Sequence, residues 1–324
     1  MSTLRRPCKN CSKEAENMVY PDYYPKFHCI AEQCKHNCCI GWEIDIDEDT
    51  LHFYDQLPGE LGKKLRAQIS RYDVPHFRLG QHDRCPFLQD NNLCELILTL
   101  GEEHLCQICT DHPRFRNELP GRLEIGIGLC CEAAGSLILG KKEPTRLLSD
   151  EALTEDDEII AIRDKAVLIL QDRSLPMAER LQKMLYLCHA HLPKDVNWAE
   201  FFLSLERLDE AWTKLLEQYR VSVKDFTSFD QHMAQRQTEY EQFCVYLAYR
   251  HMANAADRLD LAARAAFVAL GYEIIHTLGA ILYDRNGHFD FEDQVELARH
   301  FSAEIEYSED NLEAVFDELA FENA

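Results

Sequence analysis

The sequence lacks an uninterrupted run of about 18 uncharged apolar residues, which a membrane-spanning helix would need. Its first residues include Arg5 and Arg6 but no apolar stretch after them, so a secretory signal is not expected either. Basic residues are scarce, with 34 Lys and Arg against 57 Asp and Glu, and the net charge of −23 would repel nucleic-acid and lipid phosphates. We therefore expect a cytoplasmic protein that binds neither nucleic acid nor membranes.

What the sequence has in quantity is apolar residues and cysteine. An apolar fraction of 46% over 324 residues excludes a disordered chain, and the length admits two domains. Twelve of the 14 cysteines lie within residues 1–131. The net charge also changes near residue 131. Residues 1–131 carry 15 basic and 20 acidic side chains, which gives a net charge of −5. The remaining residues carry 19 basic and 37 acidic side chains, which gives −18. The Gly140–Pro144 segment would stop a helix, so we predict a tail at 1–23, a cysteine-rich module at 24–140 and a helical domain at 141–324.

The helical domain is predicted from apolar residues that recur at intervals of three and four. The expected helices cover 159–170, 176–188, 198–219, 229–251 and 259–283. The last of these is the most apolar and is predicted to be the buried centre of a bundle, with a turn at 285–288 and a short acidic helical tail after it. The predicted fold class is mostly α: a loop-rich, metal-binding cysteine module followed by an α-helical bundle.

Clustered thiols in a cytoplasmic protein indicate metal or redox ligands rather than disulfides. Thiolates favour zinc or iron–sulfur centres, and either is commonly held by four cysteines. The irregular spacing favours iron–sulfur slightly over zinc. Cys188 and Cys244 are predicted to be buried inert thiols, and the Cys8–Cys11 pair is either a tail or a separate weak metal site. The nine candidate metal ligands are Cys29, Cys34, Cys38, Cys39, Cys85, Cys94, Cys106, Cys109 and Cys130, with Cys34, Cys38, Cys39 and Cys109 ranked first.

Three segments partly resemble known functional motifs, and the residues at the key positions show how far each resemblance extends. A radical S-adenosylmethionine motif would need a cysteine where Gly41 stands, so that chemistry is not predicted. The Glu124–Cys130 segment partly imitates a methyltransferase glycine loop, but Cys130 replaces its last glycine, and we favour a tight turn that presents Cys130 to a metal centre. The Asp45–Asp49 acids lack the glycine and the final glutamate of a calcium loop and are predicted to lie at a strand end and a helix N-terminus.

Several segments together resemble the flagellin lysine-N-methylases, which share their cysteine pattern with putative zinc- or iron-chelating proteins. The resemblance runs from about Tyr24 to the C-terminus, and its combination of Cys-x3-Cys-Cys-x-Gly-Trp with Cys-Pro-Phe-Leu is highly specific. The segments are Tyr24–Cys29, Cys34–Trp42, Ile46–Thr50, Cys85–Leu88, Asn92–Cys94, Leu100–Cys106, Cys109 with His112–Arg114, Gly128–Ala134, Tyr246–His251 and Glu306–Leu312.

The resemblance implies an S-adenosylmethionine-dependent methyltransferase that acts on lysine ε-amines of flagellin and holds a [4Fe–4S] cluster with part of the cysteine set. Arg250, with Tyr249 and His251 beside it, and Arg114 are the candidate cofactor-binding residues, since an arginine pairs well with a carboxylate. An ion pair within the fold is the commoner alternative for Arg250. Trp42 is a candidate shield over the metal.

Other functions stay open at this point. The main alternative is a non-catalytic zinc- or iron-chelating helical scaffold, and a third is a redox sensor that uses Cys106 and Cys109 as a dithiol. The sequence identifies no catalytic residue and does not indicate an oligomeric state. The acidic helical domain would attract a cationic lysine substrate, although a solvated helix surface explains the same charges.

Overall fold

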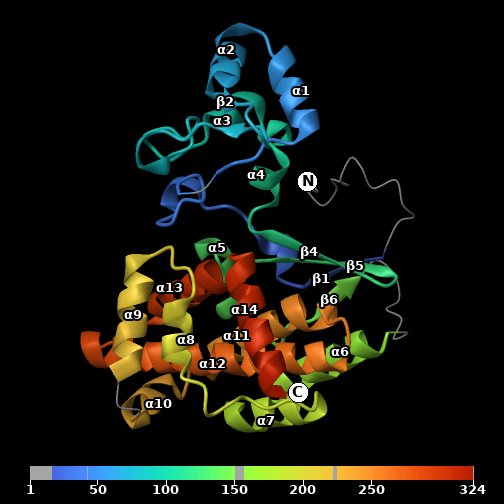
Figure 1. The fold of residues 1–324 in the computed structure, drawn as a ribbon, viewed down its shortest axis with the longest axis vertical. Helices are drawn as coiled ribbons and strands as arrows, with labels where there is room; N and C mark the ends of the chain where they lie inside the picture. The colour runs from blue at the N-terminus through green and yellow to red at the C-terminus, as the bar shows by residue number, and fades with distance from the viewer. Residues whose placement is uncertain (1–16, 42, 150–156, 222–224, 324) are drawn as a thin grey trace. The chain divides into compact units, whose positions relative to one another are not determined.

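The computed structural model describes residues 17–41, 43–149, 157–221 and 225–323 (Figure 1). The chain divides into two compact units: unit 1 comprises residues 1–27 and 116–324, and unit 2 comprises residues 28–115. Within the described ranges the chain forms 14 α-helices and two small sheets, which confirms the mostly helical fold class. Trp42, Cys8 and Cys11 lie outside the described residues.

The division into units falls elsewhere than the predicted domain boundaries. Residues 116–139, predicted as part of the cysteine module, pack in unit 1, where α5 contacts α11 and α13. Asn17–Pro21, predicted as part of a tail, form strand β1 of the same unit. The helices of unit 1 are α5 (Glu132–Leu139), α6 (Glu158–Leu170), α7 (Met177–Leu187), α8 (Trp198–Ser204), α9 (Glu210–Val221), α10 (Thr227–Met233), α11 (Gln237–His251), α12 (Arg258–Asn286), α13 (Phe291–Phe301) and α14 (Glu309–Asn323).

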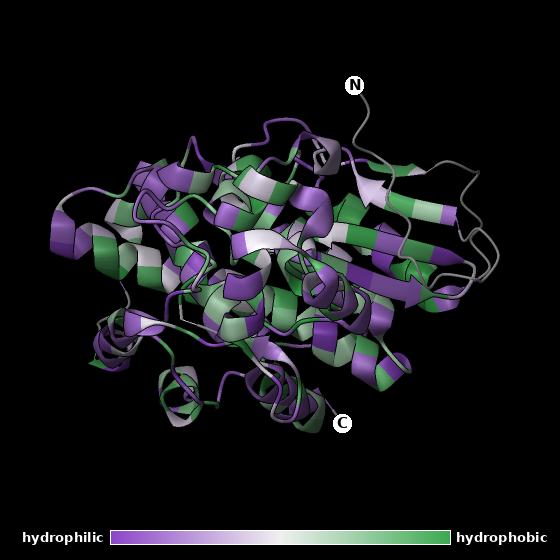
Figure 2. Ribbon diagram, turned by 90° about the horizontal axis from the view of Figure 1, so that it is seen from above, coloured by the Kyte–Doolittle hydropathy of each residue, from purple (hydrophilic) through white to green (hydrophobic). Residues whose placement is uncertain are grey.

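Helix α12 is the buried centre of unit 1, as predicted. It packs against α7, α9, α11, α13 and α14. It begins where the Asp257 side chain accepts hydrogen bonds from the N–H groups of Leu259 and Asp260, and it ends at Gly287, whose φ of 74° is the left-handed conformation typical of a helix end. By length and composition α12 could cross a membrane, but 72% of its most apolar window is buried inside the protein, as in a core helix. Figure 2 shows hydrophobic and hydrophilic residues alternating along the surrounding helices.

The helix predicted at 198–219 is wrong in extent, because the chain leaves the helix after Ser204 and begins α9 at Glu210. The Glu304 carboxylate accepts the backbone N–H groups of Leu208 at 2.9 Å and Asp209 at 2.7 Å, which satisfies donors that a continuous helix would use internally. A distant side chain therefore stabilises a break that the local pattern does not indicate.

The helix predicted at 229–251 is likewise two helices, α10 and α11. Arg236 precedes α11, and its guanidinium donates to the Phe289 carbonyl while pairing with Glu239. The predicted acidic tail is helical, but it comprises α13, a π-helical segment at Ser302–Glu306 and α14. The π segment closes with a hydrogen bond from the Tyr307 N–H to the Ser302 carbonyl at 3.0 Å.

A four-stranded sheet in the order β4-β5-β1-β6 was not predicted from the sequence. Its strands are β1, β4 (Arg114–Leu119), β5 (Arg122–Ile127) and β6 (Leu147–Ser149). β1 runs parallel to β5 and antiparallel to β6. β5 is buried along most of its length, and the fully buried Glu124 carboxylate accepts a hydrogen bond from Arg163 of α6 at 2.9 Å. This ion pair joins the sheet to the helices.

Unit 2 has short elements, as the predicted loop-rich module should. Its helices and strands are α1 (Glu48–Gln56), α2 (Gly59–Gln68), β2 (Ile69–Ser70), β3 (His76–Phe77), α3 (Glu95–Leu100) and α4 (Gln107–Asp111). β2 pairs antiparallel with β3. One apolar core holds these elements together, with Tyr54, Leu65 and Phe77 at its centre. The acids at its start lie as predicted: Asp45 forms an isolated bridge with His76, and Asp47 is the N-cap of α1.

Candidate functional site

Backbone pairing brings separate cysteine segments of unit 2 together. The Cys85 N–H donates to the Cys39 carbonyl at 2.8 Å, next to an isolated bridge between Ile40 and Arg84. A second bridge pairs Leu88 with Cys94. These short contacts place thiols from sequence-distant loops next to one another, without a regular sheet.

Five of the nine candidate metal ligands belong to the apolar core of unit 2. Cys85 and Cys106 are buried in it, and Cys39, Cys94 and Cys109 pack against it partly buried. The Sγ atoms of Cys106 and Cys109 lie 3.3 Å apart on the first turn of α4. The Cys-x2-Cys spacing therefore produces a close thiol pair that faces the same core as the other three cysteines.

The thiols also influence one another's ionisation. Burial raises the pKa of Cys85 to about 11, and the neighbouring Cys94 and Cys106 add to that rise. The hydrogen bond that the Cys39 thiol donates to Cys38, together with burial, raises the pKa of Cys39. Cys38 and Cys106 differ from these: a hydrogen bond with Cys39 lowers the pKa of Cys38, and one with Cys109 lowers the pKa of Cys106. Several thiolates cannot form so close together without a compensating cation, so the donor set fits a positively charged inorganic centre, which would deprotonate its ligands on binding.

The spacing of the sulfurs bears on which centre fits. A zinc ion with four thiolates at Zn–S distances of about 2.3 Å needs sulfurs about 3.8 Å apart. Among the described residues, one group of three potential ligand side chains has its ligand atoms within 4.8 Å of one another. This group is His288, Asp290 and Asp293, so no three of the described cysteine sulfurs lie that close together. The donor set, with its close pair at Cys106 and Cys109, therefore fits either a zinc ion or an iron–sulfur cluster.

The remaining cysteine candidates are placed differently. Cys29 and Cys34 lie on the preceding loop, where the Cys29 sulfur accepts from the Ala31 N–H and the Cys34 thiol donates to the His36 carbonyl. Cys130 belongs to unit 1, on the turn between β5 and α5. Gly41, which breaks the radical S-adenosylmethionine motif, has a φ of 90°.

Arg114 lies just after α4 in unit 2. Its guanidinium donates to the Thr110 carbonyl at 2.9 Å, one residue beyond Cys109. Burial and the Arg114 charge lower the pKa of the neighbouring His112 to about 4, so this histidine is neutral at physiological pH. Arg114 therefore supports the C-terminal end of the short helix that carries the thiol pair.

A second candidate site is a buried polar network in unit 1. Three of the segments that carry the family resemblance meet there. The Glu306 carboxylate accepts from His251 at 2.7 Å and from the Tyr246 hydroxyl at 3.1 Å, and it forms an ion pair with Arg250 at 3.4 Å. Arg250 donates to the Tyr246 oxygen at 2.6 Å and lies over the Tyr307 ring, 4.5 Å from its centroid.

The third segment contributes its backbone and a thiol to this network. The Leu129 N–H donates to the Tyr246 oxygen at 3.2 Å, and the Tyr307 hydroxyl packs against Gly128 and hydrogen-bonds the Cys130 thiol. Burial raises the pKa of Cys130 to about 12. Tyr246, Glu306 and Tyr307 were not among the predicted site residues, although all three lie in the segments that carry the resemblance.

Charge within the network is balanced. Burial would raise the pKa of Glu306, but Arg250 and His251 hold it below its usual value, so the carboxylate is ionised. Burial lowers the pKa of His251 despite this partner. Glu306 and His251 are almost fully buried, whereas Tyr307 is 40% exposed, so Tyr307 with the edge of Arg250 forms the accessible part of the site.

Tyr249, a predicted neighbour of Arg250 in cofactor binding, faces another environment. Its hydroxyl lies 3.1 Å from the carbonyl oxygens of both Val19 and Ile125, between strands β1 and β5. The Arg163 guanidinium lies 5.1 Å from its ring centroid. Tyr249 therefore holds α11 to the sheet.

The glycine-loop lookalike is a strand and a turn. Glu124 and Gly126 lie inside β5, and the Glu124 carboxylate is occupied by Arg163. Only Gly128–Cys131 forms the turn before α5, which agrees with the preference for a tight turn over a dinucleotide-type fold. Cys188 and Cys244 are buried, as predicted.

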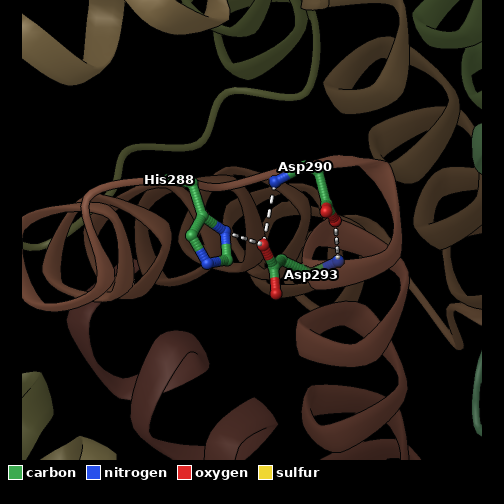
Figure 3. A group of neighbouring side chains, drawn as sticks. All are labelled: His288, Asp290 and Asp293. Carbon is green, nitrogen blue, oxygen red and sulfur yellow. Dashed lines mark hydrogen bonds and ion pairs between the residues drawn. The ribbon is translucent and has the colours of Figure 1, made fainter.

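The compact group of His288, Asp290 and Asp293 has a structural explanation (Figure 3). Asp290 is the N-cap of α13 and accepts from the Asp293 N–H at 3.0 Å, while Asp293 accepts from the Asp290 N–H at 2.8 Å. This reciprocal pair is a capping box, and His288 forms a salt bridge with Asp293 at its edge. Helix capping accounts for the proximity of the three side chains.

Comparisons with known proteins point to one family. Residues 191–324 match the FliB lysine N-methylase C-terminal domain. The "Lysine-N-methylase" of Salmonella typhimurium is 25% identical over 236 residues, which are 63% of this chain and 54% of that protein, and that of Salmonella choleraesuis matches equally. The "Flagellar biosynthetic protein FliU" of Salmonella muenchen is 26% identical over 140 residues, 39% of this chain and 79% of that protein. No solved structure matches the chain.

The chain spans about half the length of the curated lysine-N-methylases that it matches. The matched C-terminal domain contains Tyr246, Arg250, His251, Glu306 and Tyr307, and so most of the buried network of unit 1. The match of residues 191–324 to the FliB lysine N-methylase C-terminal domain, together with the lysine-N-methylase relatives, agrees with the resemblance found in the sequence.

Proposed function

We propose that this chain is a cytoplasmic, S-adenosylmethionine-dependent protein-lysine N-methyltransferase that acts on flagellin and holds a [4Fe–4S] cluster with four of its N-terminal cysteines. The observation that carries the proposal is the family match over residues 191–324, which contains Arg250 and most of the buried network around it. The names of the relatives, lysine-N-methylase and a flagellar biosynthetic protein, support the reaction and the substrate class.

The metal ligands are proposed from the cysteine core of unit 2. Cys39, Cys85, Cys94, Cys106 and Cys109 share one apolar core, and Cys38 hydrogen-bonds Cys39 at its edge. We favour an iron–sulfur cluster because the cysteines come from irregularly spaced loops, and four thiolates from this set would supply the usual ligation. Cys29 and Cys34 stay candidates of lower rank because they lie on the loop before the apolar core of unit 2, and Cys130 because it belongs to unit 1.

Arg250 is the proposed partner of the cofactor carboxylate. Bound S-adenosylmethionine supplies an electrophilic methyl group on a sulfonium. Arg250 lies at the accessible edge of its network, where a guanidinium favours a carboxylate. Glu306, His251 and Tyr246 fix its orientation. Because Glu306 and His251 are buried, they position Arg250 and Tyr307 and do not reach the ε-amine of a protein substrate.

A dithiol function for Cys106 and Cys109 has one observation in its favour, the 3.3 Å separation of their sulfurs. However, Cys106, the thiol with the lowered pKa, is 0% exposed. An exchanging thiolate must reach its partner disulfide, so burial of the attacking sulfur disfavours a redox sensor and favours ligation.

Anaerobic purification tests the metal centre first. A brown protein with about four irons and four sulfides per chain is expected. A colourless protein with stoichiometric zinc would support the non-catalytic chelating scaffold instead. The iron-loaded protein is then incubated with flagellin and S-adenosylmethionine, and steps of about 14 Da on flagellin lysines are expected by mass spectrometry. Unmodified flagellin in the presence of an intact cluster would refute the enzyme assignment.

Variants of Arg250 test the cofactor site. Arg250→Lys keeps the charge but loses the planar fork that pairs with a carboxylate, so weaker S-adenosylmethionine binding is expected by calorimetry. Arg299→Lys is a matched control, since the Arg299 guanidinium forms a two-point ion pair with Glu296 in α13. Equal cofactor affinity in the Arg250 variant and the control would remove Arg250 from the site.

A further inference from the structure

One carboxylate in unit 2 connects two helix starts that are far apart in sequence. The Asp47 Oδ1 atom accepts from the Thr50 N–H at 3.0 Å and caps α1, and its Oδ2 atom accepts from the Gln107 N–H at 2.8 Å. Gln107 is the first residue of α4, directly after Cys106. Asp47 therefore uses both oxygens, one to begin its own helix and one to hold the helix that carries the thiol pair.

The same helix α1 contacts the Cys106 segment at two further points. The Tyr54 hydroxyl donates to the His104 carbonyl at 2.7 Å, and the Phe53 ring stacks on the His104 ring at 4.5 Å with an interplanar angle of 9°. Contacts from α1 thus fix His104 and Gln107 on either side of Cys106. Tyr54 is buried and its pKa is raised by burial and by the nearby Cys106 and Cys109, which places it beside the thiols.

We propose that Asp47 is a positioning residue of the metal centre, whose carboxylate fixes the first turn of α4 and so orients the thiols of Cys106 and Cys109 toward a bound metal or cluster. This inference rests on the proposed metal centre. Hydrogen bonds of a charged acceptor are stronger than neutral ones, and groups that orient metal ligands without touching the metal commonly affect its affinity. The backbone N–H donors hold the pKa of Asp47 below its usual value although burial opposes this, so the acceptor is ionised.

Asp47→Asn is the first test. Asparagine is a good N-cap residue and has a single oxygen acceptor, so it can cap α1 or bind Gln107 but cannot do both through oxygen. Asp49→Asn is the matched control, because it removes the same charge from the exposed first turn of α1. The expected result is metal loss to a chelator about 10- to 100-fold faster in Asp47→Asn than in wild type, with Asp49→Asn unchanged.

A second pair of variants removes the donor instead of the acceptor. Gln107→Pro deletes the N–H at the first position of α4, where proline is well accommodated, and also removes the side chain that donates to Asp111. Cys106 before it already has φ −64° and ψ 157°, as a residue before proline requires. Gln107→Ala keeps the N–H and removes the side chain. We expect Gln107→Pro to lose metal as fast as Asp47→Asn, and Gln107→Ala to behave as wild type.

The readouts are iron, sulfide and zinc per chain, the visible spectrum of the anaerobically isolated protein, and the helical circular dichroism of each variant. Metal retention by both Asp47→Asn and Gln107→Pro at the wild-type level would overturn the positioning role and leave the metal centre standing. Equal losses of metal and of helix content in both would make Asp47 a purely structural residue and also overturn it. Wild-type protein without iron, sulfide or zinc would refute the metal centre itself and this inference with it.

Discussion

A Cβ atom added to Gly128 would lie 2.0 Å from the hydroxyl oxygen of Tyr307, so the tyrosine packs directly on the bare α-carbon of this glycine. The contact joins the turn before α5 to the residue that follows the π-helical segment. Because the added methyl group cannot fit without displacing Tyr307, Gly128→Ala is expected to lower the free energy of unfolding by about 1–3 kcal/mol in urea titrations. It should also weaken the packing of Tyr307 against Arg250.

Two variants sharpen this expectation. Gly80→Ala is the control, because its added Cβ atom would meet only the Arg84 carbonyl oxygen at 3.5 Å, an ordinary contact. Tyr307→Ala removes the clashing ring, so the double variant Gly128→Ala/Tyr307→Ala should be more stable than the sum of the single changes predicts, by about 0.5–3 kcal/mol. Strictly additive effects would show that the glycine is not required by the tyrosine.

Local sequence patterns were sufficient where the deciding interactions are local. The apolar content of 259–283 predicted the core helix α12, and the acids after Asp45 predicted a strand end and the Asp47 helix cap. They failed where a distant side chain decides the structure. The break between α8 and α9 depends on Glu304, which accepts an N–H 95 residues away, at Asp209.

The candidate sites, too, were predicted where the sequence signal is local and missed where distant residues decide the structure. Cysteine clustering in the sequence predicted the candidate ligands, and five of these nine cysteines share the apolar core of unit 2. The network of unit 1 was only partly predicted. Arg250 was singled out, but its pairing with Glu306 depends on the π-helical segment that turns Glu306 inward, and no periodicity in the sequence indicates this segment. β5 was missed because it contains Glu124, whose burial depends on Arg163 in another helix.

Removing the charge of Glu124 is expected to destabilise unit 1 strongly. Glu124 and Arg163 are both 0% exposed, and Glu124 also pairs with the buried Arg122, so Glu124→Gln removes the carboxylate that two buried guanidinium groups share and leaves Asp164 as their charged partner. Loss of one member of a buried pair commonly costs about 3–5 kcal/mol, and thermal unfolding should show it. Glu118→Gln on the exposed face of β4 is the control. A folded, stable Glu124→Gln protein that has lost S-adenosylmethionine binding would instead make this carboxylate a cofactor ligand.

Stability is expected to fall between pH 7 and pH 5, in part because of His112. Its pKa of about 4 in the folded chain lies below the usual value of about 6.5, so in this range the unfolded chain binds a proton that the folded chain does not. The stabilisation is therefore complete above about pH 6.5 and decreases as the pH falls toward 4, by about 1–2 kcal/mol at pH 5. Buried His251 and His300, whose pKa values are also lowered, act in the same direction.

The contribution of His112 can be separated by substitution. His112→Gln cannot gain a proton, so its urea unfolding free energy should change less between pH 7 and pH 5 than that of wild type. His52→Gln changes an exposed histidine of α1 and should leave the wild-type pH dependence intact. Identical pH profiles for His112→Gln and wild type would show that His112 is not buried as a neutral ring.

The group formed by His288, Asp290 and Asp293 is expected to stabilise α13 without any metal. Asp290→Ala removes the N-cap acceptor of the Asp293 N–H, which should lower the free energy of unfolding by about 0.5–2 kcal/mol. Because a cap does not need a cation, the loss should be the same with and without a chelator. His288→Ala leaves both hydrogen bonds of the capping box in place and should be close to neutral. If calcium or zinc raised the stability of wild type but not that of His288→Ala, the three side chains would be metal ligands, since only coordination would make the imidazole necessary for a metal-dependent gain.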